Sequence, residues 1–165
     1  MSRGFVKESD QEEVPLVVPR APIPNGVTNY VTPNGLEELE EEQKQLIAKR
    51  EKLKTENAEK NRVQINHIRA NLDLLVKRIN SAIVIDLENQ PKDTVHFGAT
   101  VTICMEDDSD EQHYQIVGVD EADISKNKVS FLSPIARVLM NKKVGDQFNL
   151  KTPKSDRAMK VKAIE

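Results

Sequence analysis

VSFLSPIARVLMNKKVGDQFNL, residues 129–150, decides the fold of the second half of this chain. Its middle predicts a short helix, because Ser133 supplies a hydroxyl cap and Pro134 presets the φ angle of the first helical residue. The apolar residues of this helix are Ile135, Ala136, Val138, Leu139 and Met140. Residues 144–146 predict a turn, after which Phe148 and Leu150 alternate with polar residues as in a half-buried strand. The stretch therefore predicts a strand, a helix and a returning strand.

The flanking sequence adds further short strands. Residues 96–103 and 113–119 are apolar runs that flank an acidic segment, residues 106–111, which predicts a hairpin with a solvated turn rather than a cation loop. Residues 129–132, 147–151 and 158–164 complete the set, with the helix after Ser133 as the one helical insertion. Residues 86–165 thus predict an α+β domain.

The preceding part predicts two helices. After a start signal at residues 32–35, leucines recur on one helical face at positions 36, 39, 46 and 53. A second stripe begins near Asn61 and consists of Ile65, Ile68, Leu72, Leu75, Ile79 and Ala82. Residues 55–60 are a short polar link, so residues 33–85 predict an antiparallel coiled-coil hairpin.

Charge is uneven along this hairpin. Its root is acidic, whereas eight basic residues stand against three acidic ones between Lys44 and Arg69. The basic side chains nearest the tip are Lys52, Lys54, Lys60 and Arg62. They are candidates for contact with nucleic-acid phosphates or an acidic surface, although charge at exposed heptad positions is also the ordinary way to solvate a coil.

The N-terminal residues 1–32 predict an extended or disordered tail, because four prolines between positions 15 and 24 prevent a helix. This tail is either a linker or a segment that docks on a partner. The net charge is −3, and the single cysteine excludes an internal disulfide. No apolar run reaches the roughly 20 residues of a membrane span, and the N-terminus lacks a signal-peptide core, so we expect a cytoplasmic protein without membrane contact.

The sequence offers little support for enzyme chemistry. Phosphate-loop, dinucleotide, nucleophile-elbow and zinc-protease motifs are absent. The DEAD tetrapeptide at residues 120–123 predicts only a surface turn, since no phosphate loop accompanies it. The three histidines show no metal-ligand spacing. We therefore expect neither a metal site nor a cofactor.

Two stretches carry a family resemblance. SPIARVLMNKKVGD, residues 133–146, resembles a signature of the C-terminal domain of the Gre transcript-cleavage factors of bacterial RNA polymerase, and residues 81–102 resemble the segment before it. The resemblance covers residues 31–165. It implies an FKBP-like domain, in which antiparallel strands pack on one short helix. It also implies RNA polymerase as partner, with docking at Ser133, Pro134, Ile135 and Arg137; alternatively, Ser133 and Pro134 only cap the helix.

The family's hairpin enters the secondary channel of the polymerase, and an acidic pair in a segment like D-x-x-E-N-A-E helps to hold a catalytic Mg²⁺ there. Glu56 and Glu59 match the two glutamates, but Leu53 replaces the aspartate. We therefore assign catalysis firmly to no residue and leave Glu56 and Glu59 as candidates. Any Mg²⁺ would be shared with the polymerase active site.

Together these features predict a transcription elongation factor or regulator that rescues or modulates backtracked complexes, with nascent RNA or DNA as further candidate partners. One alternative is a non-cleaving polymerase regulator that resembles the regulator of nucleoside diphosphate kinase. Another is an FKBP-like peptidyl-prolyl isomerase, which would need an aromatic pocket built from Phe97, Tyr114, Phe131 and Phe148. Homodimerisation through the coil is a structural alternative.

Overall fold

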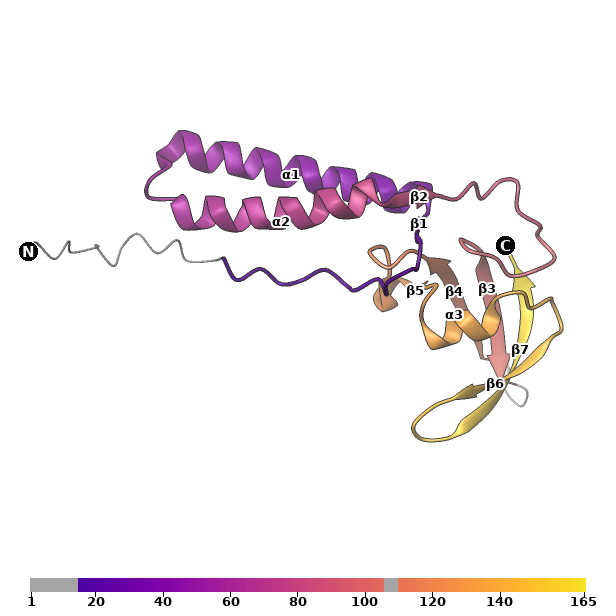
Figure 1. The fold of residues 1–165 in the computed structure, drawn as a ribbon. Coiled ribbons are helices and arrows are strands. Elements are labelled where there is room, and N and C mark those ends of the chain that lie inside the picture. The colour runs from indigo at the N-terminus through magenta and orange to yellow at the C-terminus, as the bar shows by residue number, and fades with distance from the viewer. Residues whose placement is uncertain (1–14, 106–109) are drawn as a thin grey trace, which may run out of the picture.

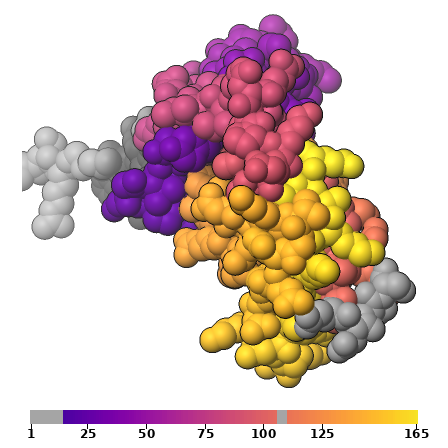
Figure 2. Space-filling view, turned by 90° about the vertical axis from the view of Figure 1, so that its right-hand side faces the viewer, coloured from indigo at the N-terminus to yellow at the C-terminus, as the bar shows by residue number. Residues whose placement is uncertain are grey.

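The computed structural model describes residues 15–105 and 110–165. A long two-helix arm projects from a smaller domain built on a curled sheet, and the N-terminal segment runs alongside the arm toward that domain (Figure 1). The space-filling view shows the arm, the segment that follows it and the C-terminal domain stacked from top to bottom (Figure 2). Among the described residues, no helix combines the length and apolarity needed to cross a membrane.

The arm consists of α1 (Pro33–Asn57) and α2 (Arg62–Asn80). Thr32 caps α1 by accepting a hydrogen bond from Gly35 N, and Pro33 occupies the first turn, as the start signal predicts. The buried side chains of the seam are Leu39, Ile65, Ile68, Leu72 and Leu75. The expected link at residues 55–60 is wrong in its start, because α1 continues to Asn57 and only residues 58–61 lie between the helices.

Two three-residue strands join the base of the arm to the N-terminal segment. β1 (Asn29–Val31) pairs in parallel with β2 (Ala82–Val84), so Ala82 lies in a strand and not in the second helix. Asn29 Nδ2 donates hydrogen bonds to Arg78 O at 3.0 Å and to Ser81 Oγ at 3.1 Å. The last residues of the predicted tail are therefore part of the folded structure.

The C-terminal domain contains a five-stranded sheet in the order β5-β4-β3-β7-β6. Its strands are β3 (Thr100–Met105), β4 (Glu111–Val117), β5 (Lys128–Ser130), β6 (Gln147–Lys151) and β7 (Asp156–Ile164). A 3₁₀ turn, η2 (Ile124–Lys126), precedes β5. The expectation of a wholly antiparallel sheet is wrong, because β5 runs parallel to β4. Most of the acidic turn predicted at residues 106–111 lies outside the described residues.

The core lies between this sheet and the short helix α3 (Pro134–Leu139). Fully buried side chains include Val101, Ile103 and Val161 from the sheet and Ala136 and Leu139 from α3. Phe148 of β6 is also buried, in agreement with the alternation in the sequence. The order of strand, helix and returning strand predicted for residues 129–150 is confirmed.

Candidate functional site

The predicted docking residues surround the start of α3. Ser133 Oγ accepts a hydrogen bond from Ala136 N at 3.3 Å, so its hydroxyl caps the helix. Ile135 is partly buried against the core, whereas Pro134 and Arg137 are exposed. Pro134 and Arg137 are therefore the two residues of this group that offer most surface to a partner.

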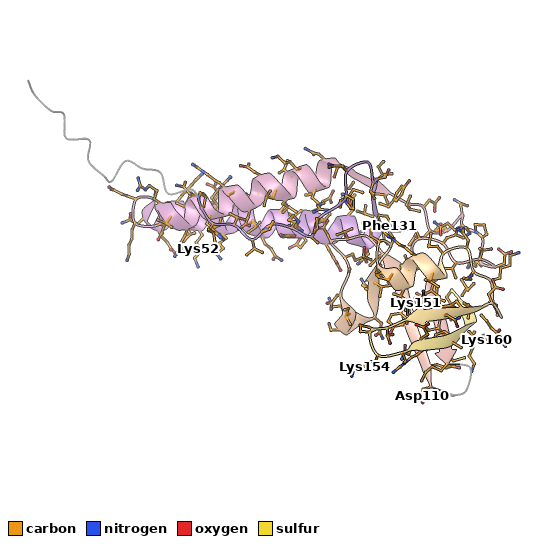
Figure 3. All side chains as sticks on the ribbon, turned by 60° about the horizontal axis from the view of Figure 1, so that its bottom comes forward. Lys52, Asp110, Phe131, Lys151, Lys154 and Lys160 are labelled. Atoms are coloured by element: carbon orange, nitrogen blue, oxygen red, sulfur yellow. The ribbon has the colours of Figure 1, made fainter. Side chains whose placement is uncertain are left out.

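The predicted basic residues lie around the end of the arm, far from α3, as the position of Lys52 in Figure 3 illustrates. Lys52 Nζ lies 3.9 Å from Glu56 Oε1, and Lys54 Nζ lies 3.0 Å from Glu51 Oε1. Lys60 and Arg62 are exposed and form no ion pair with another described residue. Two of the four cations are thus partly neutralised within the arm.

Two asparagine side chains form hydrogen bonds with backbone groups at the tip of the arm. Asn57 Oδ1 accepts a hydrogen bond from Lys60 N at 2.9 Å, and Asn61 Nδ2 donates one to Leu53 O, also at 2.9 Å. The link between the helices is therefore held by hydrogen bonds of side chains to the main chain. This geometry fixes where Glu56 and Glu59 lie.

Glu56 and Glu59 are both exposed, and Glu56 faces the ammonium group of Lys52. Among residues 15–105 and 110–165, no three His, Cys, Asp or Glu side chains gather where they could hold a metal ion. Leu53, at the position of the family aspartate, is half-buried and cannot act as a ligand through its side chain. The residues present therefore do not fit a Mg²⁺ site of their own.

A group of charged residues that the sequence analysis did not identify joins the arm to the C-terminal domain. Arg20 binds both carboxylate oxygens of Glu42 on α1, at 2.9 and 3.0 Å, and its Nε lies 3.0 Å from Asp120 Oδ1. Arg78 of α2 approaches the same Asp120 carboxylate, at 3.2 Å. The hydrogen bond to Glu42, followed by that to Asp120, raises the pKa of Arg20. Asp120 thus receives two guanidinium groups from different segments.

Glu121 forms the second half of this connection. Its carboxylate is hydrogen-bonded to Thr32 Oγ1, to Asn34 Nδ2 at 3.1 Å and to Lys128 Nζ at 2.9 Å. Burial raises the pKa of Glu121, but the hydrogen bonds from Thr32, Lys128 and Asn34 outweigh it, and the pKa is lowered overall. The predicted surface turn is therefore wrong in one respect: the turn exists, but Glu121 is buried and the Asp120 side chain is only 9% exposed. We call the contacts that Asp120 and Glu121 make with the arm and the N-terminal segment the joint.

Aromatic contacts complete the joint. Tyr30 of β1 lies against Phe97 and Phe131, with ring centroids 6.1 and 5.8 Å away. The backbone of Tyr30 also requires a glycine at position 118, because a Cβ atom on Gly118 would lie 2.6 Å from Tyr30 O. Phe131 lies where the arm meets the C-terminal domain (Figure 3). The four aromatic residues that an isomerase pocket would use are buried or packed against the core, with Tyr30 covering two of them.

Comparison with known proteins places this architecture. Residues 90–165 match the family described as transcription elongation factor, GreA/GreB, C-term. The chain is 34% identical over 153 residues to transcription elongation factor GreB of Neisseria meningitidis, covering 83% of this chain and 93% of the relative. It is 48% identical over 79 residues to GreA of Maricaulis maris, and this match covers 48% of this chain and 50% of the relative.

A solved GreA/GreB structure from Nitrosomonas europaea is 22% identical and covers 82% of this chain and 97% of its own, with a TM-score of 0.43. The sequence relationship to GreB extends over both the arm and the C-terminal domain. The chain therefore belongs to the GreA/GreB family of transcription elongation factors.

Proposed function

We propose that this protein binds RNA polymerase through its C-terminal domain, inserts the arm toward the secondary channel and modulates backtracked complexes by occupying that channel. The observation that carries the proposal is the joint at Asp120 and Glu121. It fixes a two-helix arm to the domain that would dock, as a channel-occupying factor requires. Such a protein would act in the cytoplasm, where bacterial RNA polymerase works.

Docking would use the start of α3. Pro134 and Arg137 are exposed there, while the Ser133 cap and the partly buried Ile135 hold the loop in one conformation. A surface held in this way loses little conformational entropy on binding. A charge reversal at Arg137 should weaken binding to core polymerase without unfolding the protein, since the side chain is exposed.

The composition of the arm tip favours a protein that occupies the channel without cleaving RNA. A catalytic Mg²⁺ needs several carboxylate or water oxygens in fixed positions, and the tip offers two exposed glutamates, one of them opposite Lys52. The same feature favours the second candidate function, a non-cleaving regulator that resembles the regulator of nucleoside diphosphate kinase. In either case the arm would exclude other molecules from the channel rather than supply a catalytic group.

The experiment is RNA-length analysis of purified backtracked elongation complexes incubated with the protein at several Mg²⁺ concentrations. We expect the transcripts to keep their length while the protein remains bound. If the unaltered protein shortens the transcripts and the Glu56→Ala, Glu59→Ala variant does not, the protein is a true cleavage factor and this proposal is wrong.

Binding itself is tested with Arg137→Glu. Lys143→Glu is the matched control, because Lys143 is also exposed and in the same domain but lies outside the docking group. Equal polymerase affinity of the two variants would reject α3 as the docking site. We also propose that the C-terminal domain is a variant of the FKBP-like fold, with a mixed sheet over one helix.

A further inference from the structure

The hairpin formed by β6 and β7 carries the strongest positive charge of the C-terminal domain. Residues 147–164 contain five basic residues, namely Lys151, Lys154, Arg157, Lys160 and Lys162, against Asp156, a net charge of +4 in a chain whose net charge is −3. Figure 2 shows the yellow C-terminal part extending below the rest of the domain. The excess charge is therefore concentrated on a projecting element.

Four of these cations are free to bind a partner. Lys162 is neutralised, because its Nζ lies 2.6 Å from Glu111 Oε1. The other four are all exposed, and none forms a hydrogen bond or ion pair through its side chain with another described residue: Lys151, Lys154, Arg157 and Lys160. We call these four residues the basic ribbon. Fixed cations left without counter-charges are typical of surfaces that bind anions.

The register of the hairpin puts most of this charge on one face and a single cation on the other. Lys151 is paired with Asp156 of β7. Asp156 and Lys160 are four positions apart on that strand and therefore point to the same side, so Lys151 and Lys160 lie on one face. Arg157 is opposite Leu150 and lies on the other face, which packs on the core through Phe148, Met159 and Val161, so both faces are open only near the turn. Lys154 lies in the turn that joins the strands. Figure 3 shows the three lysines spread along the hairpin.

Around the turn, Lys151 and Arg157 lie on opposite faces and Lys154 lies between them, so the end of the hairpin matches a groove with negative charge on both sides. The major groove of duplex DNA is about 12 Å wide, admits a two-stranded β-ribbon and is bordered by phosphates on each side. A flat anionic surface would contact only one face of the ribbon. The distribution of charge therefore favours a duplex groove over a planar acidic surface.

The rest of the hairpin surface excludes two other kinds of partner. Its only aromatic residue, Phe148, is buried, so no ring is available to stack with the bases of a single strand. No large apolar side chain of β6 or β7 is exposed, whereas protein–protein interfaces are centred on such residues and are poor in lysine. Lysines without apolar anchors suit contacts to a sugar–phosphate backbone.

We propose that the basic ribbon binds duplex DNA through its phosphates, with the exposed end of the β6–β7 hairpin in the major groove and without strong sequence preference. This contact lies at the opposite end of the molecule from the arm tip, marked by Lys52 in Figure 3, and is separate from the docking residues of α3. It does not depend on binding to polymerase and can be measured with the isolated protein.

The test measures binding of the full chain to a fluorescent duplex of about two helical turns, or roughly 20 base pairs. Four phosphate contacts predict a fall in affinity of about 100-fold when the salt concentration rises fourfold. The variant Lys151→Gln, Lys154→Gln, Arg157→Gln, Lys160→Gln should bind more than about tenfold more weakly at low salt and lose most of this salt dependence.

The arm provides a matched control. Lys44→Gln, Lys49→Gln, Arg69→Gln, Lys77→Gln removes the same number of lysines and arginines from exposed positions of α1 and α2, and it should bind the duplex as the unaltered protein does. Equal losses in the two variants would overturn the proposal in favour of non-specific attraction.

Unchanged duplex binding by the hairpin variant would also overturn it, as would tighter binding to single-stranded RNA of the same length than to the duplex. If the hairpin variant loses affinity for polymerase but not for DNA, the ribbon is a protein contact. Circular dichroism would show that both variants remain folded.

Discussion

Glu121 is the residue whose ionisation most directly affects how the arm is held. It is 6% exposed, and its carboxylate accepts hydrogen bonds from three side chains. Glu121→Gln removes the charge and leaves Lys128 without its main counter-ion, so we expect the free energy of unfolding to fall by about 1–3 kcal/mol. Urea denaturation measures the change. Glu37→Gln, an exposed substitution on α1, is the control and should change stability by less than about 0.5 kcal/mol.

The same residue predicts a pH dependence. Because the pKa of Glu121 is lowered from 4.5, its contribution to stability is fully present above pH 4.5 and is lost as the pH falls through the lower folded value. The difference in unfolding free energy between the unaltered protein and Glu121→Gln should therefore be largest near neutral pH and shrink in acid. A difference that grows as the pH falls would contradict the assignment.

Gly35 tests the same contact from the helix side. Alanine normally stabilises a helix relative to glycine by about 1 kcal/mol. Here a Cβ would lie 2.6 Å from Glu121 Oε2, a carboxylate already held by three partners, so Gly35→Ala should destabilise the protein. In a Glu121→Ala background the carboxylate contact is absent and only Thr32 Oγ1, at 3.2 Å, lies near the new Cβ, so the substitution should be much less destabilising. Equal effects of Gly35→Ala in the two backgrounds, measured by thermal unfolding, would show that the contact is unimportant.

At the scale of elements, local patterns were sufficient where neighbours in sequence determine structure. The Ser133–Pro134 start of α3 and the leucine and isoleucine stripes of the arm depend on contacts within one or two turns. The short strand pair β1–β2 was not predicted, because three residues carry too little periodicity and their pairing is about fifty residues apart. The parallel direction of the β4–β5 pairing was missed because β5 has only three residues, and so short a strand does not reveal the direction in which it pairs.

The joint could not be predicted either. Arg20 and Asp120 are 100 positions apart, and nothing in an acidic tetrapeptide distinguishes a solvated turn from a buried pair of carboxylates. The one signal in the sequence was Arg20, a single cation between the prolines of an extended segment, for which acidic residues elsewhere in the chain could serve as partners. Long-range ion pairs are set by the packed fold, so they become visible only when the arm and the domain are placed together.

This joint predicts that Asp120 limits the motion of the arm. Asp120→Asn weakens both guanidinium contacts, and the distance between a spin label at Glu59→Cys near the tip and one at Lys154→Cys should become more widely distributed. The natural Cys104 is first replaced by serine. Asp73→Asn, on the exposed side of α2, is the control. Identical distance distributions for Asp120→Asn and the control would mean that other contacts hold the arm.

At the scale of the whole molecule, the protein separates a docking domain from a rod that reaches away from it. Deletion of residues 47–53 together with residues 65–71 removes seven residues from each helix and preserves the heptad seam, with Leu46 and Leu72 next to the new tip. The arm would shorten by about 10 Å, since an α-helix rises 1.5 Å per residue.

If the arm acts by occupying the channel, this shortened protein should bind polymerase with unchanged affinity but lose its effect on backtracked complexes. Glu56→Ala plus Glu59→Ala, at full length, should keep that effect, because occupancy depends on the length of the rod rather than on carboxylates at its tip. A shortened protein that remains fully active would transfer the function to the C-terminal domain. Loss of activity in the glutamate variant alone would instead restore a catalytic role for the tip.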